Sequence, residues 1–104
     1  MSEGDASPVY SLVWRPQAED DLVGIVDYIA QDAAAKALEF GRQLQQKTLL
    51  LQHNPRLGRT GRPGLPDGVR ELVLHPNYIL FYRLLEASAT AEILRVKHAS
   101  QKFP

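Results

Sequence analysis

Three arginines recur at every third position of the segment RLGRTGRPG, and a glycine lies in each gap between them. The guanidinium groups of Arg56, Arg59 and Arg62 can hold carboxylates or phosphates through paired hydrogen bonds. Because a segment rich in glycine and proline forms no regular element, we expect it to display these charges along a line, as a docking rim for a partner. Two alternatives stay open: the charges are solvated, or they pair with helical acids such as Asp27 or Glu39.

A second set of residues could cleave RNA through its own 2′-hydroxyl group. That reaction needs a base for the hydroxyl proton, cations for the charged phosphorane and an acid for the leaving oxygen. The predicted strands offer Arg70, Tyr82, Arg83 and His98. Tyr82 and Arg83 are adjacent, so they point to opposite faces of a strand. Arginine is also a poor general base, because its pKa lies above about 12. We assign no catalytic residue and expect a protein that binds rather than an enzyme.

The three histidines do not predict a metal centre. His53 and His75 lie beside turn-forming residues and are expected to be turn residues, whereas His98 ends a predicted strand and is either a structural group or a catalyst. The histidines lie far apart in the sequence, and the chain has no cysteine. Zinc and similar ions need three or four such ligands in one place. We therefore predict neither a metal nor a cofactor.

Length and charge indicate one domain with an uneven charge distribution. The 104 residues have no net charge, but residues 1–52 hold four basic and eight acidic groups, and residues 53–104 hold eight basic and four acidic groups. This asymmetry suggests that one face meets an anionic partner, unless acids simply collect at helix starts. The start of the chain does not resemble a secretory signal, and no apolar run reaches the roughly 20 residues of a membrane span. A cytoplasmic location is expected.

The first half of the chain is predicted to form a strand and two helices. Residues 1–8 are small and polar and are expected to be flexible. Residues 9–14 alternate as a strand does. Pro16 suits the first position of a helix that ends near Gln31, and Asp32 is expected to cap a second helix. So short a link predicts an antiparallel helical hairpin.

Each predicted helix carries an apolar stripe. The first stripe consists of Ala18, Leu22, Ile25, Val26 and Ile29. The second consists of Ala37, Leu38, Gly41, Leu44, Thr48 and Leu51. Residues three and four apart share one face of a helix, so these stripes are expected to be buried. Gly41 lowers helix stability by about 1 kcal/mol relative to alanine, and we expect it to permit close approach of the first helix.

The second half is predicted to form a loop and three strands. Residues 53–68 contain four glycines and three prolines and are expected to be irregular. Strands follow at 69–74, 78–85 and 91–98, and their short connections predict an antiparallel meander. The middle strand is almost entirely apolar, so both of its faces should be covered. The element order β-α-α-β-β-β predicts an α+β fold, with a helical hairpin packed on an antiparallel sheet.

Several motifs, taken in order, resemble the ParE/RelE superfamily of type II toxin–antitoxin toxins, and the ParE branch in particular. The resemblance covers the chain from Val9 to Pro104, which is expected to be a single toxin domain over residues 9–104. Its most specific parts are the helical residues Asp21, Leu22, Ile25 and Tyr28, the pattern Pro55-x-x-Gly58-Arg59 running into Arg70-Glu71-Leu72, and the ending His98 to Pro104.

The resemblance implies a growth-arresting toxin, of the kind used in plasmid stabilisation, which an antitoxin holds harmless. In the ParE branch the target is DNA gyrase and the antitoxin is ParD-like, and operator DNA is reached only through that antitoxin. Two alternatives stay open. The chain could be a RelE-like ribosome-dependent mRNA endoribonuclease, or a degenerate member of the family that only binds its antitoxin.

Two groups of residues are the predicted contact sites. The family's C-terminal end is tied to toxicity, and the arginines form the other charged feature. The candidates for target binding are Arg56, Arg59, Arg62, Arg70, Arg83, His98, Lys102 and Phe103. An antitoxin's disordered tail could fold against the helical hairpin and along an exposed sheet edge. The candidates for antitoxin binding are Leu22, Ile25, Ile29, Leu44 and Leu51.

Overall fold

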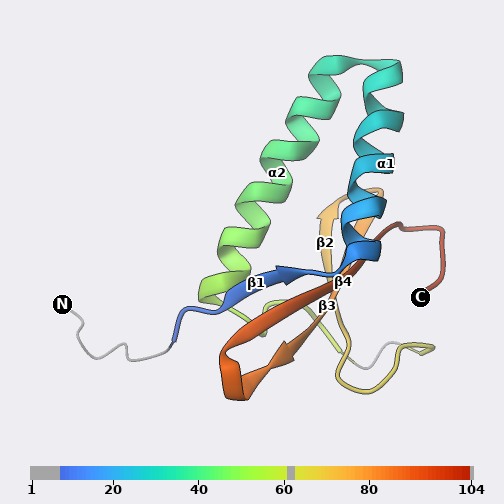
Figure 1. Cartoon of the computed structure of the whole chain (residues 1–104). Coiled ribbons are helices and arrows are strands. Elements are labelled where there is room, and N and C mark those ends of the chain that lie inside the picture. The colour runs from blue at the N-terminus through green and yellow to red at the C-terminus, as the bar shows by residue number, and fades with distance from the viewer. Residues whose placement is uncertain (1–7, 61–62, 104) are drawn as a thin grey trace.

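The protein is a helical hairpin on one face of a four-stranded sheet, seen in a computed structural model that describes residues 8–60 and 63–103 (Figure 1). The elements are β1 (Ser11–Trp14), α1 (Pro16–Asp32), α2 (Ala34–His53), β2 (Arg70–His75), β3 (Tyr78–Leu85), a short 3-10 turn (Glu86–Ser88) and β4 (Thr90–His98). The predicted α+β class and element order are confirmed. Of the tail expected at residues 1–8, residues 1–7 lie outside the described residues.

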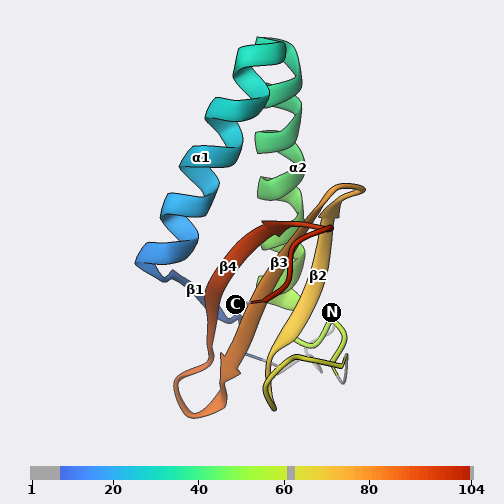
Figure 2. The same ribbon diagram turned by 90° about the vertical axis from the view of Figure 1, so that its right-hand side faces the viewer.

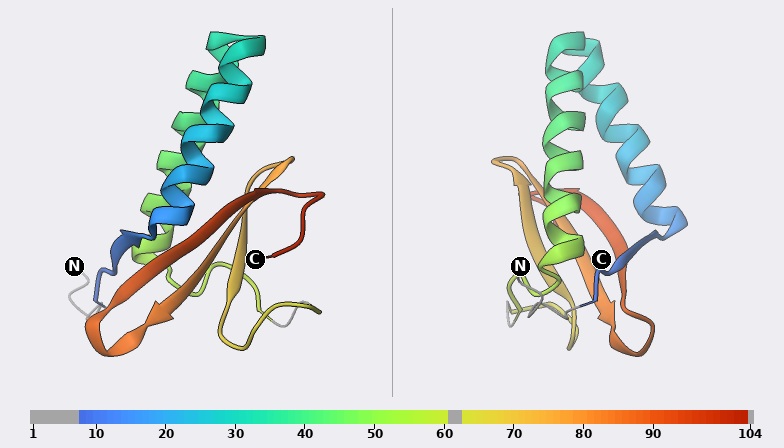
Figure 3. Two further views of the ribbon diagram at one scale, coloured as in Figure 1. Left: turned by 45° about the vertical axis from the view of Figure 1, so that its right-hand side comes forward. Right: turned by 90° about the vertical axis from the view of Figure 1, so that its left-hand side faces the viewer.

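The two helices are joined by a single extended residue. Ala33 has φ −159° and ψ 121°, which breaks the helix and lets α2 run back antiparallel to α1 (Figure 3). Ala33 is also the N-cap residue of α2, so the predicted cap at Asp32 is wrong. Asp32 is the last residue of α1, and its carboxylate accepts a hydrogen bond from Lys36 Nζ at 3.2 Å instead.

The buried face of α2 agrees with the predicted stripe at Thr48 and Leu51 but not at Leu38 or Gly41. Phe40, Thr48 and Leu51 are its buried residues, whereas Leu38 is 73% exposed. A methyl group added to Gly41 would meet nothing within 4 Å, so this glycine does not serve a close approach. Each residue turns a helix by about 100°, so Leu38 lies roughly 200° away from Phe40. The stripe through Phe40 faces the sheet, and the predictions for Leu38 and Gly41 are wrong.

The sheet has the strand order β1-β4-β3-β2. Strands β2, β3 and β4 form the predicted antiparallel meander. Strand β1 runs parallel to β4, from the pair Ser11↔Thr90 to the pair Trp14↔Ile93, so the sheet is mixed rather than antiparallel throughout. A tight turn dictates antiparallel neighbours, but β1 reaches β4 only through the fold, so no local signal set its direction.

Both faces of the central strand β3 are covered, as predicted. Towards the helices, Leu80 and Tyr82 pack in the main core with Leu51 of α2. On the other face, Ile79 and Phe81 form a second apolar cluster. Partners of that cluster come from the loop and the C-terminal segment, which lie over the face that the helices leave open (Figure 2). The fold therefore brings the loop and the tail, far apart in sequence, to one surface.

Candidate functional site

The described arginines of the loop pair with acids of the sheet region rather than with the helices. Arg56 forms an ion pair with Glu86, just after β3. Arg59 Nε lies 3.6 Å from the carboxylate of Glu71, a side chain that is almost wholly buried in β2. The backbones of Arg59 and Glu71 also exchange two hydrogen bonds, of 2.9 and 3.0 Å. The loop thus continues the sheet edge, and both arginine side chains stay more than half exposed. The candidate Arg62 lies outside the described residues.

A buried carboxylate holds two further arginines at the same end of the sheet. Glu92 Oε1 accepts a hydrogen bond from Arg83 Nε at 2.6 Å, and Glu92 Oε2 accepts one from Arg15 Nη1 at 3.2 Å. The hydrogen bond from Arg83 holds the pKa of Glu92 below its ordinary range, although burial opposes this. Arg15 was not predicted as a site residue. Only the parallel pairing of β1 with β4 brings Arg15 to Glu92, and no local sequence signal predicts that pairing.

Tyr82 anchors the arginine loop from inside the core. Its hydroxyl donates to the carbonyl oxygen of Pro55 at 2.7 Å and accepts from the backbone N–H of Gly58 at 2.8 Å. Arg70 Nη1 adds a 2.8 Å hydrogen bond to the carbonyl oxygen of Gly58. The Tyr82 side chain has no exposed surface, and burial raises its pKa. This hydroxyl is therefore a structural anchor for the loop. We call the residues Arg15, Arg56, Arg59, Arg70 and Arg83 the basic rim.

The C-terminal candidates lie beside the loop. The ring of Phe103 packs against that of Phe81 on the outer face of the sheet, with the ring centroids 5.0 Å apart. Lys102 and Phe103 line a hollow of about 510 Å³ together with Gly64 and Leu65 of the loop. The structure thus brings together the two segments that were predicted separately as target contacts.

His98 lies apart from the other candidates. Its Nδ1 accepts a hydrogen bond from the Ser100 backbone N–H at 3.1 Å, and its ring meets Tyr78 edge-on at 5.4 Å. Tyr78 is its partner across the strands, and Tyr82 lies four residues further along β3. At about 3.3 Å per residue, His98 and Tyr82 are roughly 13 Å apart along the sheet. The fold does not bring these two candidate acid–base groups to one place.

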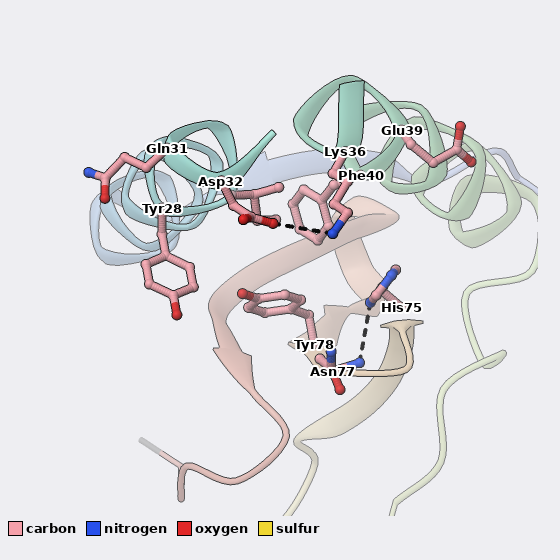
Figure 4. A pocket seen from close by; sticks show the side chains of 10 residues that line it. Tyr28, Gln31, Asp32, Lys36, Glu39, Phe40, His75, Asn77 and Tyr78 are labelled. Carbon is pink, nitrogen blue, oxygen red and sulfur yellow. Dashed lines mark hydrogen bonds and ion pairs between the residues drawn. The ribbon is translucent and has the colours of Figure 1, made fainter. Parts of the chain in front are cut away.

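The predicted antitoxin-binding residues divide into two kinds. Leu22, Ile25, Ile29 and Leu44 are partly buried against the core and keep some exposed surface. Leu51 has no exposed surface and is a core residue. Ile29 lines a groove of about 710 Å³ between the hairpin and the β2–β3 turn (Figure 4). A second hollow of about 610 Å³ continues it beneath α1, where Ile25 and His98 are among the lining residues.

Asp21 joins α1 to the exposed edge of β4. Strand β1 pairs with β4 only as far as Ile93, and beyond that point the Val96 N–H donates to Asp21 Oδ2 at 3.0 Å. Arg95 donates two further bonds to the same carboxylate, at 2.7 and 3.0 Å. Burial disfavours the charged form, but the bonds from Arg95 and Val96 outweigh it and lower the pKa of Asp21. A helical side chain thus occupies an edge position that a partner strand would otherwise use.

We expect the protein to lose stability in acid because Asp21 and Glu92 must be protonated. Their pKa values in the folded state lie below the ordinary values of 3.8 and 4.5. A carboxyl group whose pKa is lower in the folded state than in the unfolded state stabilises the fold at pH values above its unfolded-state pKa. This stabilisation is lost as the pH falls from the unfolded-state pKa through the folded-state pKa. The free energy of unfolding, measured in urea between pH 7 and 3, should therefore decrease as the pH drops below about 4.5.

The variant Asp21→Asn tests this assignment. It should lower the free energy of unfolding at pH 7 and weaken the dependence of that free energy on pH below 3.8, the ordinary pKa of aspartate. Asp27→Asn, at an exposed position of the same helix, is the matched control and should retain the wild-type dependence. An unchanged acid dependence in Asp21→Asn would show that this carboxylate is not linked to folding.

Metal ligation and membrane insertion find no support among the described residues. Within residues 8–60 and 63–103, no group of three histidine, cysteine, aspartate or glutamate side chains could hold a metal ion. Over the same ranges, no helix combines the length and apolar character needed to cross a bilayer. His53 is the last residue of α2 and His75 is the last residue of β2, so the prediction that they are turn residues is wrong, although each lies beside a turn.

Comparison with known proteins agrees with this architecture. Residues 12–103 match the family model described as "ParE toxin of type II toxin-antitoxin system, parDE". Toxin RelE2 of Caulobacter vibrioides is 32% identical over 90 residues, covering 86% of this chain and 96% of the relative.

Two solved structures share the fold. A chain of the chromosomal ParDE toxin–antitoxin system of P. aeruginosa is 30% identical, with a TM-score of 0.69 over 88% of this chain and 98% of that chain. A chain of the RelBE2 toxin–antitoxin complex of Mycobacterium tuberculosis is 28% identical, with a TM-score of 0.59 over 88% and 99%.

A helical hairpin on a mixed four-stranded sheet, matched over nearly its whole length, defines a toxin of a type II toxin–antitoxin system. The chain belongs to the ParE toxin family.

Proposed function

We propose that this toxin inhibits DNA gyrase by binding it, breaks no covalent bond itself, and is neutralised by a ParD-like antitoxin. The observation that carries the proposal is the separation of the candidate acid–base groups. The Tyr82 hydroxyl is buried and committed to the loop backbone, and His98 lies roughly 13 Å away along the sheet. General acid–base catalysis needs both groups within hydrogen-bonding reach of one substrate. A gyrase target implies action in the cytoplasm.

The basic rim and the adjoining C-terminal segment form the proposed gyrase contact. The side chains of Arg56 and Arg59 are more than half exposed. The Arg56–Glu86 pair is exposed on both sides, and exposed ion pairs contribute only about 0–1 kcal/mol each, so a carboxylate or phosphate of a partner can replace Glu86 at little cost. Lys102 and Phe103 extend this surface beside the loop. The contact therefore joins a charged loop to an apolar tail.

The antitoxin is proposed to bind at the other end of the molecule. The groove beneath the helical hairpin is lined by Ile29 and lies next to the end of β4. Ile25 lines the second hollow of this groove. Leu22 and Leu44 lie on the same hairpin and are only partly buried against the core, so an apolar segment can cover their exposed surface. Both solved relatives belong to toxin–antitoxin systems. Operator DNA is reached through this antitoxin rather than through the toxin.

A supercoiling assay with purified gyrase tests the target. The toxin should inhibit supercoiling, and brief expression in cells should cause filamentation and a DNA-damage response. Addition of the antitoxin should restore supercoiling. Full gyrase activity at toxin concentrations that arrest growth would overturn the gyrase proposal.

Loss of two exposed cations should weaken gyrase inhibition. The double variant Arg56→Gln/Lys102→Gln should raise the toxin concentration for half-inhibition by about tenfold or more, because hydrogen bonds to charged groups contribute about 1.5–3 kcal/mol each. Its fold should persist, since the partner Glu86 remains solvated at the surface. Arg42→Gln, at an exposed ion pair on α2, is the matched control and should inhibit like wild type. Equal inhibition by all three proteins would remove Arg56 and Lys102 from the gyrase contact.

The endoribonuclease alternative is favoured by one observation, the 32% identity to Toxin RelE2. The purified toxin added to a translating extract decides between the two. Cleavage of transcripts on ribosomes that is lost in His98→Ala would establish the nuclease. Intact transcripts together with inhibited gyrase would support the proposal above.

A further inference from the structure

The groove beneath the helical hairpin has an aromatic lining. Phe40 and Tyr78 form its floor, with ring centroids 5.2 Å apart in an edge-on arrangement. Tyr28 stands at its mouth, and its side chain is 71% exposed (Figure 4). These rings come from α1, α2 and β3, so no single element could have predicted them as a group. An open aromatic surface of this kind binds apolar groups and also cations, because the ring faces are negative.

The groove is also acidic. Its two hollows are lined by four carboxylates and one lysine, namely Asp20, Asp21, Asp32, Glu39 and Lys36. Asp21 is neutralised by Arg95, but the other acids remain at the surface. Asp32 pairs with the exposed Lys36, and Glu39 pairs with the exposed Arg42 and accepts a 3.4 Å hydrogen bond from Gln43 Nε2. Such exposed pairs are weak and exchange readily. The groove therefore offers carboxylates next to aromatic faces.

We propose that this groove accepts an amphipathic segment of the antitoxin that carries arginine or lysine, with one cationic head seated against Tyr28 and Tyr78 next to Asp32. A second cationic head would lie further along α2, next to Glu39, whose side chain points away from those rings (Figure 4). This inference rests on the proposed neutralisation by an antitoxin and names the chemistry of the segment that does it. A cation is favoured because both the ring faces and the carboxylates attract positive charge. An acidic segment would meet repulsion here and fits the basic rim instead.

Binding of the antitoxin to the full-length toxin tests the inference, by calorimetry at 50 and 300 mM salt. Affinity should fall at the higher salt, because exposed charges are screened there. The double variant Asp32→Asn/Glu39→Gln should bind about tenfold more weakly at low salt and lose most of the salt dependence. Tyr28→Ala should weaken binding several-fold, and its fold should persist because the ring is exposed. The matched control is Asp27→Asn, on the same helix but outside the groove lining, and it should bind like wild type.

Two helical peptides with the same leucine pattern provide a second probe, one with arginines and one with glutamates at the polar positions. The arginine peptide should bind wild-type toxin and compete with the antitoxin, and it should bind the carboxylate variant poorly. Preference for the glutamate peptide would overturn the inference. The inference would also be overturned if wild type and the Asp32→Asn/Glu39→Gln variant bound the antitoxin with equal affinity and equal salt dependence. The proposed neutralisation by an antitoxin would still stand in that case. Failure of the antitoxin to bind wild type would instead overturn the proposed neutralisation, and the peptide pair would still decide the chemistry of the groove.

Discussion

Leu51→Ala should destabilise the toxin strongly, although its position in the sequence suggests a residue that contacts the antitoxin. Leu51 has no exposed surface and packs in the core that joins α2 to the sheet. Truncating a buried leucine removes its transfer free energy and leaves a cavity, which together lower the free energy of unfolding by about 2–5 kcal/mol. Small domains are stable by only about 5–15 kcal/mol, so the loss is a large fraction of the total.

Thermal and urea unfolding of the isolated toxin measure this effect. The Tm should fall by at least about 10 °C for a chain of this size. Leu38→Ala is the matched control, since it is the same change on the same helix at a side chain that is 73% exposed. It should alter stability by no more than about 0.5 kcal/mol. A stable Leu51→Ala variant that loses only antitoxin affinity would contradict the burial of this residue.

Gly58→Ala should displace the arginine loop and lower stability. A methyl group at Gly58 would lie 2.7 Å from a ring carbon of Tyr82, and 2.8 Å from both its hydroxyl oxygen and the carbonyl oxygen of Glu71. The ring is fixed in the core and the carbonyl belongs to the sheet, so the loop itself must move. Overpacking of this kind costs about 1–3 kcal/mol. The move would also break the hydrogen bond from the Gly58 N–H to Tyr82.

Two measurements separate the effect on stability from the effect on the loop. The free energy of unfolding should fall by about 1–3 kcal/mol, and gyrase inhibition should weaken further under conditions where the variant is fully folded. Gly41→Ala is the matched control, because its methyl group would meet open space in mid-helix. That change should raise stability by up to about 1 kcal/mol. If Gly58→Ala were as stable as wild type, the close packing between the loop and Tyr82 would be refuted.

Charge divides this toxin into two ends with different proposed partners. The sheet end carries the basic rim, in which Arg56 and Arg59 stay exposed while paired to Glu86 and Glu71. The hairpin end carries the acidic aromatic groove. An antitoxin in the groove and a target at the rim would not occupy the same surface. Neutralisation would then require the antitoxin to reach the rim as well or to alter it through the fold, and mapping the antitoxin footprint by hydrogen exchange tests which occurs.

The helices and strands could be predicted from the sequence because their signals are local. Pro16 opens α1 at the expected position, and the alternation of residues 9–14 marks β1. The apolar run of β3 predicted a central strand with both faces covered, and the structure confirms this prediction. Loops rich in glycine and proline were equally visible. Side chains repeat about every 3.6 residues around a helix and every 2 residues along a strand. These patterns depend only on neighbours along the chain and can therefore be recognised in the sequence.

The sequence by itself therefore determined the element order, the α+β class, the helical hairpin and the presence of an arginine-rich loop. Only the tertiary structure decided the parallel pairing of β1, the burial of Leu51 against the exposure of Leu38, and the partners of the charged groups. The physical reason is distance along the chain. Arg15 and Glu92 are 77 residues apart, and Asp21 and Arg95 are 74 apart, so only the packed fold can bring these charges into contact.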